Sequence, residues 1–347
     1  MARAPRPRSS EPQTPGATGL TMEDIARLAE VSKPTVSRVL NDSPLVSAKT
    51  RDHVLRVARA NGYAVNRNAQ RLRQARANAI AVVLDFGSHR SGAIGDPFIF
   101  ELLAGISEAL SVRRQDLLLS PPGLVNLAGF RDLHRSRAAD GFIILGQGTR
   151  DPLLRDLAKA AIPIVVWGAV EPDAPYCAVG SDNLLGGRLA GERFVARGAK
   201  RWLFVGNTHH AEIGLRARGL REAAAAAKGV AIDELSLDSM AYSLTFERAA
   251  DYIRHHPHPD AVFTFSDTAA MAVISAFRDA GHLTPDHYAL VGYNNIPPSA
   301  HFTPAITTID QRTDIAGAIL VEKLMQMIDG ASAKSALLPT RIIVRET

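Results

Sequence analysis

Four neighbouring positions near the start of the chain combine basic, hydroxyl and rigid side chains: Lys33, Pro34, Ser37 and Arg38. Arg38 can donate two hydrogen bonds at once to O6 and N7 of a guanine, and Lys33 reaches the same acceptors as a point donor. Pro34 offers no side-chain hydrogen bond, so it could recognise only the shape of the DNA or contact a thymine methyl group. The chemistry expected here is therefore hydrogen bonding to base edges, with no covalent bond made or broken.

Two short helices joined by a tight turn are expected to position these side chains. Thr21 is a good N-cap for the first helix, and Asp24 gives a capping box with Asp in place of the preferred Glu or Gln. Ser32 caps the second helix, and a third amphipathic segment at 47–61 ends at Gly62. Three such helices with one polar, basic edge are the helix-turn-helix arrangement, whose second helix enters the major groove. The alternative is a three-helix packing module with an ordinary solvated face.

The distribution of charge favours the DNA-binding interpretation. Residues 1–78 contain 14 Lys and Arg against 6 Asp and Glu, whereas the whole chain has 40 against 35. The rest of the chain is therefore slightly acidic. Positive charge is concentrated where the three helices are expected, as binding to phosphates requires.

The sequence lacks the usual motifs of catalysis and of cofactor or metal binding. No G-x-G-x-x-G, Walker A or G-x-S-x-G pattern is present, and Gly146 and Gly148 lack the third glycine of a dinucleotide site. The single cysteine, Cys177, excludes an internal disulfide and a Cys-based metal site. The histidines at 209–210 and 255–258 are interpreted as surface loops, since no carboxylate or Cys is spaced to help them bind a metal. We expect no enzymatic activity, no cofactor and no metal.

The run VSKPTVSRVLN, followed by VSAKTR and then by Gly62-Tyr63, resembles the signature of the LacI family of transcriptional regulators. The resemblance extends to about residue 345 and leaves out only the first 20 or so residues. It implies a homodimer that binds palindromic operator DNA, one half-site per head, with an affinity that a small-molecule effector switches. A cytoplasmic location is expected, because the sequence shows no signal peptide and no apolar run of about 18 residues.

The resemblance assigns DNA-binding roles within the head. Lys33, Pro34 and Arg38 read base edges. Seven residues suit phosphate contacts, which fix register without reading sequence; they are Thr21, Ser32, Thr35, Ser37, Asn41, Ser47 and Thr50. Tyr63 is also included in the DNA-binding set. Each hydroxyl has an alternative role as a helix cap or a solvated group.

The Arg-rich segment 66–78 matches the hinge helix of the family, which folds on the operator. Leu72 holds the position of a leucine that enters the minor groove as a wedge, with Asn66, Ala69 and Gln70 beside it. The family usually has Pro before this Asn, whereas this chain has Val65, so the free hinge loses a rigid helix start. The alternative is a basic linker helix in which Leu72 is incidental.

From residue 78 onward strands and helices alternate, which is typical of parallel sheets in an α/β fold. The expected strands are 80–84, 117–119, 141–145, 163–167, 202–205, 261–265, 288–291 and 338–344. Two such series imply two lobes, with a ligand bound between them at the carboxyl ends of the strands. The resemblance implies a periplasmic-binding-protein-like core whose chain crosses between the lobes three times.

The resemblance also implies a set of effector-binding residues between the lobes: Asp96, Phe98, Asp182, Arg216, Ser266, Asp267 and Asn294. Arg216 matches an arginine that commonly clamps ligand oxygens. Ser266 and Asn294 stand where the family commonly has Asn and Asp, and Asn294 cannot form the charge-assisted hydrogen bond of an Asp. Asp182 has an alternative as a helix cap, and Phe98 as a core aromatic.

These interpretations divide the chain into a disordered tail (1–19), a helix-turn-helix domain (20–65), a hinge helix (66–78) and a two-lobed core for effector binding and dimerisation (79–347). The predicted function is that of a transcriptional repressor switched by a sugar or glycoside, with a nucleobase or another small metabolite as the alternative effector. The alternative function is a solute-binding receptor of the same core fold. That function predicts a signal peptide and no DNA-binding head, and the sequence meets neither expectation.

Overall fold

The computed structural model describes residues 20–40, 43–63, 76–84, 97–120, 124, 126–147, 151–237 and 241–347. The chain divides into two compact units, 1–75 and 76–347, called here the head and the core. The predicted tail, most of the predicted hinge helix and six predicted site residues lie outside the described residues: Asn41, Asn66, Ala69, Gln70, Leu72 and Asp96.

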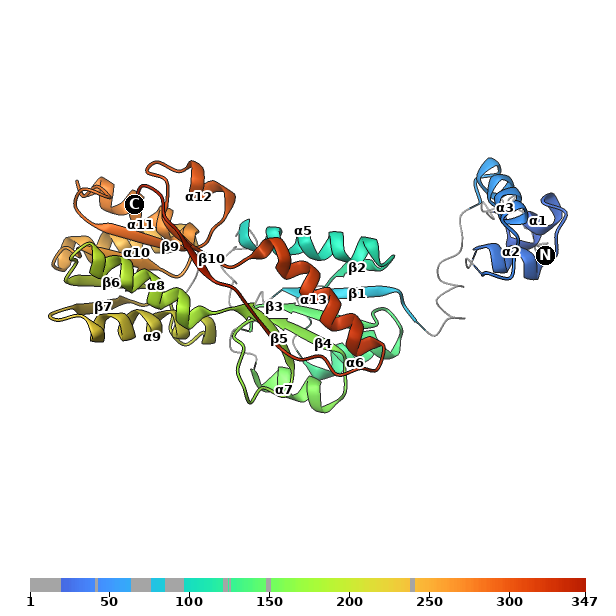
Figure 1. Ribbon diagram of the computed structural model, residues 1–347, viewed down its shortest axis with the longest axis horizontal. Coiled ribbons are helices and arrows are strands. Elements are labelled where there is room, and N and C mark those ends of the chain that lie inside the picture. Colours follow the sequence, from blue (N-terminus) through green and yellow to red (C-terminus); the bar gives the residue numbers. More distant parts are fainter. Residues whose placement is uncertain are drawn as a thin grey trace, which may run out of the picture. The chain divides into compact units, whose positions relative to one another are not determined.

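The head contains three helices, as the sequence predicts (Figure 1). They are α1 (Met22–Leu28), α2 (Lys33–Leu40) and α3 (Ala48–Ala60). Each helix contributes apolar side chains to one shared core, in which Ile25, Val36 and Val54 are fully buried. The polar residues between these positions are left on the outside, which is the amphipathic pattern that predicted the helices.

Local hydrogen bonds define the ends of the head helices. Thr21 Oγ1 accepts from Asp24 N at 3.3 Å, and Thr21 N donates to Asp24 Oδ2 at 2.9 Å, so the predicted capping box is present. The hydrogen bonds from Thr21 lower the pKa of Asp24. After α3, Gly62 has a φ of 62°, the left-handed conformation expected of the residue that ends a helix.

The first lobe of the core is a six-stranded parallel sheet with helices on both faces (Figure 1). Its strands in spatial order are β11 (Ala336–Leu338), β5 (Cys177–Ser181), β4 (Ile164–Trp167), β3 (Gly141–Leu145), β1 (Ala79–Leu84) and β2 (Asp116–Leu119). Helices α5 (Pro97–Val112) and α13 (Thr313–Ile328) cover one face, and α6 (Leu127–Arg135) and α7 (Asp151–Lys159) cover the other. Side chains of β1 alternate between these faces: Ile80 and Val82 pack with α5 and α13, and Ala81 and Val83 with α6 and α7.

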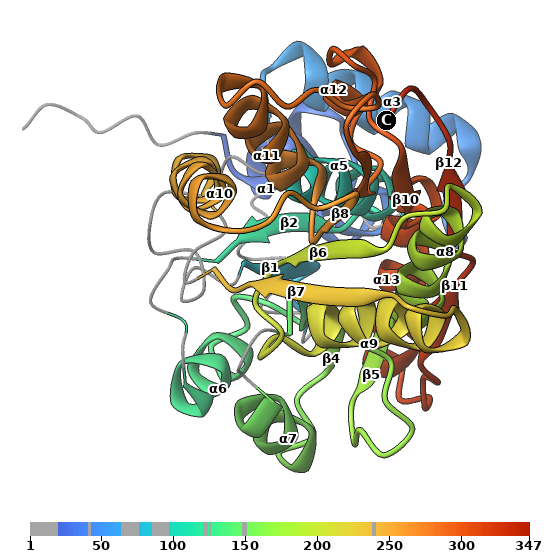
Figure 2. The ribbon, with the colours of Figure 1, turned by 90° about the vertical axis from the view of Figure 1, so that its left-hand side faces the viewer.

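The second lobe repeats this architecture (Figure 2). Its strands in spatial order are β12 (Arg341–Ile343), β10 (Thr308–Asp310), β9 (Ala289–Asn294), β8 (Ala261–Thr264), β6 (Arg201–Val205) and β7 (Ala231–Leu235). Only the pair β10 and β12 is antiparallel. Helices α8 (Asn183–Ala196) and α9 (Ala211–Ala226) lie on one face, and α10 (Tyr242–His255) and α11 (Asp267–Asp279) on the other; the short α12 (Pro297–His301) follows β9.

The chain crosses between the lobes three times, after β5, after β10 and after β11. The predicted number of crossings is therefore confirmed. The prediction of a single strand at 338–344 is wrong, because the third crossing divides this segment between β11 in the first sheet and β12 in the second. The sequence analysis also missed the strands β5, β7 and β10 and the helices α6 and α12.

Helices α5 and α13 cross at a pair of glycines. A Cβ built on Gly317 would collide with the carbonyl carbon of Gly105 and would lie 2.5 Å from the backbone nitrogen of Ile106. A Cβ built on Gly105 would lie 3.5 Å from the Cα of Gly317, which is ordinary van der Waals contact. The close approach of the two helices therefore depends on the absence of a side chain at Gly317.

Three histidines meet near the surface of the second lobe, and one of them, His258, belongs to the predicted surface cluster at 255–258. The ring of His258 lies 4.1 Å from that of His282, whose ring is 5.9 Å from that of His287. The Nε2 of His258 and the hydroxyl of the buried Tyr288 both lack a hydrogen-bond partner among the described residues. Burial, followed by the neighbouring His282 and His287, lowers the pKa of His258. Within the described residues, no group of His, Cys, Asp and Glu is arranged to hold a metal ion.

We expect His258 to make the core less stable in weak acid. The unfolded chain binds a proton on this side chain near pH 6.5, whereas the folded protein resists it, so stability falls as pH decreases through about 6.5. His258→Gln should therefore lose less melting temperature than the wild type between about pH 7.5 and pH 5.5. His209→Gln, at an exposed histidine, is the control and should behave like the wild type. Equal losses in His258→Gln and the wild type would contradict the prediction.

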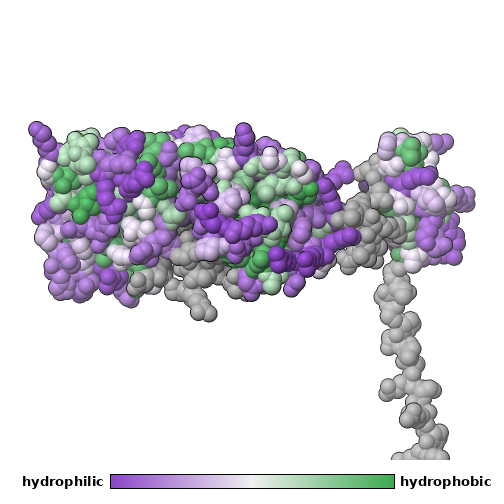
Figure 3. All heavy atoms as spheres, turned by 90° about the horizontal axis from the view of Figure 1, so that it is seen from below, coloured by the Kyte–Doolittle hydropathy of each residue, from purple (hydrophilic) through white to green (hydrophobic). Residues whose placement is uncertain are grey.

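Among the described residues, no helix combines the length and the apolar character that spanning a membrane requires. The surface shown in Figure 3 is largely hydrophilic, with hydrophobic groups scattered among the polar ones. Both lobes nevertheless expose large apolar side chains. Phe100 and Leu119 are about half exposed on the first lobe, as are Tyr242 and Leu283 on the second.

Candidate DNA interface and effector site

The predicted base-reading residues lie on the exposed side of α2. Lys33, Pro34 and Arg38 are exposed, whereas the apolar residues of the same helix face the core of the head. Ser37 is half-buried, and Tyr63 is half-buried against the same core. The structure therefore presents the three predicted side chains on one helix without any change of conformation.

Several hydroxyl groups predicted to contact phosphates act as helix caps. Thr21, Ser32 and Ser47 each accept a hydrogen bond from the backbone N–H three residues further on. Ser32 and Ser47 also hydrogen-bond to the hydroxyls of Thr35 and Thr50, at 2.8 and 2.9 Å. The capping alternative therefore holds for these three residues. They remain exposed, so capping leaves their side chains open to solvent.

Arg216 is held in one orientation inside the second lobe. It lies on α9 and is only 7% exposed. Its Nε donates to Asn183 Oδ1 at 2.8 Å, and its Nη1 donates to the backbone oxygen of Phe265 at 2.6 Å. The guanidinium carbon lies 3.6 Å from the ring centre of Tyr293, a cation–π stack. A buried arginine fixed at three points is a preorganised donor for ligand oxygens.

Close packing of α8 against α9 sets the position of Arg216. A Cβ on Gly187 would collide with the backbone oxygen of Arg216, and a Cβ on Gly219 would collide with that of Leu184. A larger residue at either position would push the helices apart. The two glycines therefore allow the Arg216 side chain to reach Asn183 at the start of α8.

Buried hydrogen bonds connect Arg216 with Asn294 through two of the lobe crossings. Asn183 Nδ2 donates to the Ser181 backbone oxygen at 3.1 Å, and Ser181 Oγ donates to Gln311 Oε1 at 2.7 Å. Gln311 Nε2 then donates to Asn294 Oδ1 at 2.6 Å. Ser181 and Asn183 flank the first crossing, and Gln311 lies in the second. Arg216 and Asn294 are therefore connected by buried hydrogen bonds to the segments that join the lobes.

Three other predicted effector residues are engaged in internal contacts. Asp182 and Ser266 cap α8 and α11, since each side chain accepts from the backbone N–H three residues further on. Asp267 is fully buried, and its carboxylate accepts from Thr308 Oγ1 at 2.5 Å and from Ile296 N at 2.9 Å. Burial raises the pKa of Asp267 to about 7 in spite of these hydrogen bonds. The geometry favours capping and positioning roles over direct effector contact for these residues.

The two lobes also contact each other away from the crossings, for example at two places. Phe98 and Trp167 of the first lobe pack with ring centres 5.9 Å apart, and Ile296 of the second lobe is buried in the same apolar cluster. Phe98 is therefore a core aromatic that also lies at the boundary between the lobes. At the second place, Gln147 N at the end of β3 donates to Glu212 Oε1 of α9 at 3.3 Å.

Five residues of this site were missed by the sequence analysis: Gln147, Asn183, Glu212, Tyr293 and Gln311. Asn183 would have been indicated if β5 had been predicted, because a polar residue just after a buried strand lies at the carboxyl edge of the sheet. Glu212 was indicated by its spacing from Arg216, because it lies one helical turn earlier and so faces the same side of α9. No pattern in the sequence indicated Gln311, because its proximity to Ser181 arises only when the chain crosses back between the lobes.

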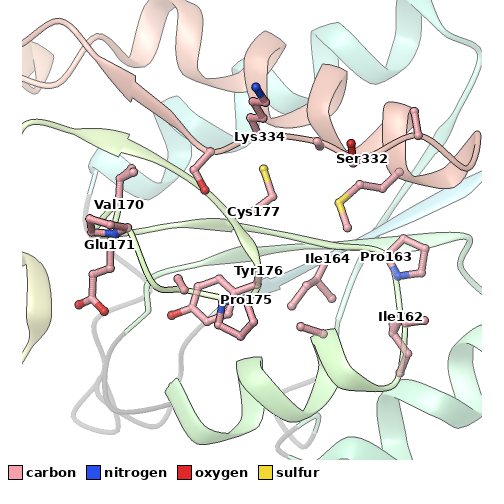
Figure 4. Close-up of a pocket in the computed structure, with 18 of the residues that line it drawn as sticks. Ile162, Pro163, Ile164, Val170, Glu171, Pro175, Tyr176, Cys177, Ser332 and Lys334 are labelled. Atoms are coloured by element: carbon pink, nitrogen blue, oxygen red, sulfur yellow. The ribbon is translucent and has the colours of Figure 1, made fainter.

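A cavity of about 620 Å³ lies at the opposite end of the first sheet (Figure 4). Pro163 and Ile164 at the start of β4 and Cys177 at the start of β5 line it, and Ser332 and Lys334 from the segment after α13 form another wall. Burial raises the pKa of the Cys177 thiol. Because Trp167 and Ser181 end the same two strands, this cavity is separate from the predicted effector site.

Comparison with protein families gives two matches. Residues 21–66 match the family described as bacterial regulatory proteins, lacI family. Residues 192–347 match the periplasmic binding protein-like domain.

Individual relatives match almost the whole chain. The HTH-type transcriptional regulator CelR of Thermobifida fusca is 31% identical over 338 residues, covering 94% of this chain and 98% of the relative. The HTH-type transcriptional repressor PurR of Photobacterium profundum is 28% identical, covering 89% and 92%.

Solved structures share the architecture. A transcriptional regulator CelR–cellobiose complex is 28% identical, covers 94% of this chain and 99% of its own, and has a TM-score of 0.67. The Lac repressor bound to ONPG in the repressed state is 24% identical, covers 95% and 100%, and has a TM-score of 0.81. The second likeness concerns the fold alone.

Proposed function

The chain belongs to the LacI family of bacterial regulatory proteins and is a DNA-binding transcriptional regulator, and from this premise we propose that it is a dimeric repressor switched by a carbohydrate. In this proposal the head at 20–65 reads one half-site of a palindromic operator and the hinge at 66–78 bends its centre through Leu72. The core at 79–347 binds the effector and forms the dimer. The observation that carries the proposal is the buried hydrogen-bond path from Arg216 to Asn294, which passes through the segments joining the lobes.

A carbohydrate effector fits the polar groups at this site. Arg216 supplies a fixed guanidinium, Gln311 and Asn294 supply amides, and Glu212 supplies a carboxylate between the lobes. Glu212 offers a charged hydrogen-bond acceptor that Asn294 does not. Support also comes from relatives that include a CelR–cellobiose complex, a ribose operon repressor from Haemophilus influenzae and a sucrose operon repressor from Staphylococcus xylosus.

A dimer would bury the apolar side chains that the core exposes on both lobes. Phe100 and Leu119 on the first lobe and Tyr242 and Leu283 on the second are the candidates for a symmetric contact along the length of the core. Such a contact would transmit a change in the angle between the lobes to the spacing of the two heads. The effector shifts the equilibrium only by its difference in affinity for the two arrangements.

Two measurements test the proposal. Selection from random DNA by the full-length protein at about 0.15 M salt should enrich a palindrome with two half-sites. A thermal-shift screen of the protein with cellobiose, sucrose, ribose and free nucleobases should give a shift with a carbohydrate, since a ligand of the folded state raises its melting temperature. Failure to enrich any palindrome would overturn the proposed regulatory role. A rise in melting temperature with nucleobases alone would overturn the proposal that the effector is a carbohydrate.

Arg38→Ala is expected to weaken binding to the selected operator about tenfold or more and to relax the preference for guanine at one position of each half-site. The reason is the loss of a side chain able to donate two hydrogen bonds to one base. Fluorescence anisotropy with the selected operator and with single-base variants measures both effects. Arg59→Ala, which removes an exposed arginine from α3, is the control. It should lower affinity for all sequences alike, and the same uniform loss in Arg38→Ala would refute base reading.

A further inference from the structure

The side chain of Glu23 lies beside the predicted base-reading residue Lys33. Glu23 is on α1 and Lys33 begins α2, and Lys33 Nζ donates to Glu23 Oε2 at 2.8 Å. The two side chains are 74% and 52% exposed. Together they present a hydrogen-bond acceptor and a donor next to each other on the outside of the head.

Glu23 has no part in the capping box of its helix. Asp24, the next residue, closes that box with Thr21 and also pairs with Arg27 at 2.6 Å. The acidic side chain of Asp24 is therefore explained by the structure of the head. Glu23 instead points toward α2, where a carboxylate would oppose binding to phosphates unless it met a hydrogen-bond donor on the DNA.

A cytosine·guanine pair offers the complement of this arrangement in the major groove. Cytosine presents the N4 amino group, a donor, and guanine presents O6 and N7, both acceptors. Cytosine N4 and guanine O6 are themselves hydrogen-bonded, at a separation of about 2.9 Å, so their spacing matches that of Lys33 Nζ and Glu23 Oε2. Glu23 can accept from N4 while Lys33 donates to O6, and both existing hydrogen bonds stay in place.

We propose that Glu23 determines specificity together with Lys33, as a composite reader of one C·G base pair in each half-site. The inference rests on the proposed function, in which α2 lies in the major groove of an operator. The lysine alone supplies only a hydrogen-bond donor, so it distinguishes the two orientations of a base pair weakly. A donor and an acceptor held side by side distinguish them more strongly. The carboxylate supplies this second contact and fixes which strand carries the cytosine.

The experiment compares the base preferences of four full-length proteins by selection and sequencing of bound DNA at about 0.15 M salt: wild type, Glu23→Gln, Lys33→Ala and Asp52→Asn. Wild type should prefer C·G at one position of each half-site. Glu23→Gln should reduce that preference about fivefold or more, and Lys33→Ala should alter the same position. Asp52→Asn removes an exposed carboxylate from α3, so it should strengthen binding to all DNA without changing the preference.

The outcomes are distinct. Glu23→Gln with the unchanged base profile of Asp52→Asn would overturn the inference and leave the proposed function standing. Glu23→Gln and Lys33→Ala acting at different positions would also overturn it, because a composite reader acts on one base pair. A wild type that enriches no palindrome would overturn the proposed function and the inference together. Glu23→Gln keeps the capping box and the buried core, so the head should fold as the wild type does.

Discussion

Arg216→Ala is expected to lower the free energy of unfolding of the core by about 3 kcal/mol and to abolish the response to an effector. The substitution leaves the Phe265 backbone oxygen without its buried donor and leaves Asn183 Oδ1 with only the longer hydrogen bond from the Tyr293 hydroxyl, at 3.3 Å. It also exposes the face of Tyr293 to a void. Unpaired buried acceptors cost about 1–3 kcal/mol each, and loss of the cation–π contact adds to this. Chemical denaturation of the purified core measures the stability.

A second variant separates the effector response from stability. Arg216→Lys keeps the charge but loses the planar fork that holds two acceptors, so the protein should fold and bind its operator while responding poorly to the carbohydrate found in the thermal-shift screen. Arg218→Ala is the matched control, because Arg218 lies on the same helix, is exposed and pairs with Glu222 at 3.2 Å. It should leave both properties nearly unchanged. A folded Arg216→Lys protein with a normal response would remove Arg216 from the effector site.

Gly317→Ala should destabilise the first lobe by about 3 kcal/mol, since its new methyl group would collide with the backbone of α5 at Gly105 and Ile106. A backbone cannot rotate away as a side chain can, so α13 must move off the sheet that it covers. Gly105→Ala, on the facing helix, places its methyl group at ordinary contact distance. Alanine is the better helix former, so this variant should gain up to about 1 kcal/mol.

The two glycines serve as controls for each other, because they lie in the same helix crossing and receive the same substitution. Denaturant titrations of both variants give the free energies of unfolding. Equal destabilisation by the two substitutions would show that the crossing adapts to added volume. Destabilisation by Gly317→Ala but not by Gly105→Ala would show that the backbone around Gly317 cannot move to accommodate a methyl group.

Features with a local cause were predictable from the sequence. The capping box at Thr21, the turn at Gly62 and the buried strands β1, β3 and β8 all follow from residues within a few positions of one another. The missed strands lack such a local pattern. β7 (AIDEL) is an edge strand with mostly exposed residues, and β10 is three residues long and exists because β9 and β12 flank it.

The site was predictable in part for the same reason. Arg216 could be placed from the family motif around it, but its partners Asn183, Phe265 and Tyr293 come from three separate segments of the chain. No local pattern around Asp267 indicated that its side chain is buried. Its carboxylate accepts from Thr308, a contact that exists only because β10 pairs beside β9.

The second lobe crossing, after β10, has a consequence for the order in which the protein folds during synthesis. The apolar core between the first sheet and its helices includes Leu320, Leu324 and Leu338, which leave the ribosome only after strands β6 to β10 of the second lobe. Until then, the face of the sheet formed by Ile80 and Val82 lacks α13, although most of the second lobe has already emerged. The lobe whose synthesis begins first is thus still incomplete when most of the second lobe has been made, and a nascent chain stalled before α13 would expose this apolar surface to chaperones and proteases.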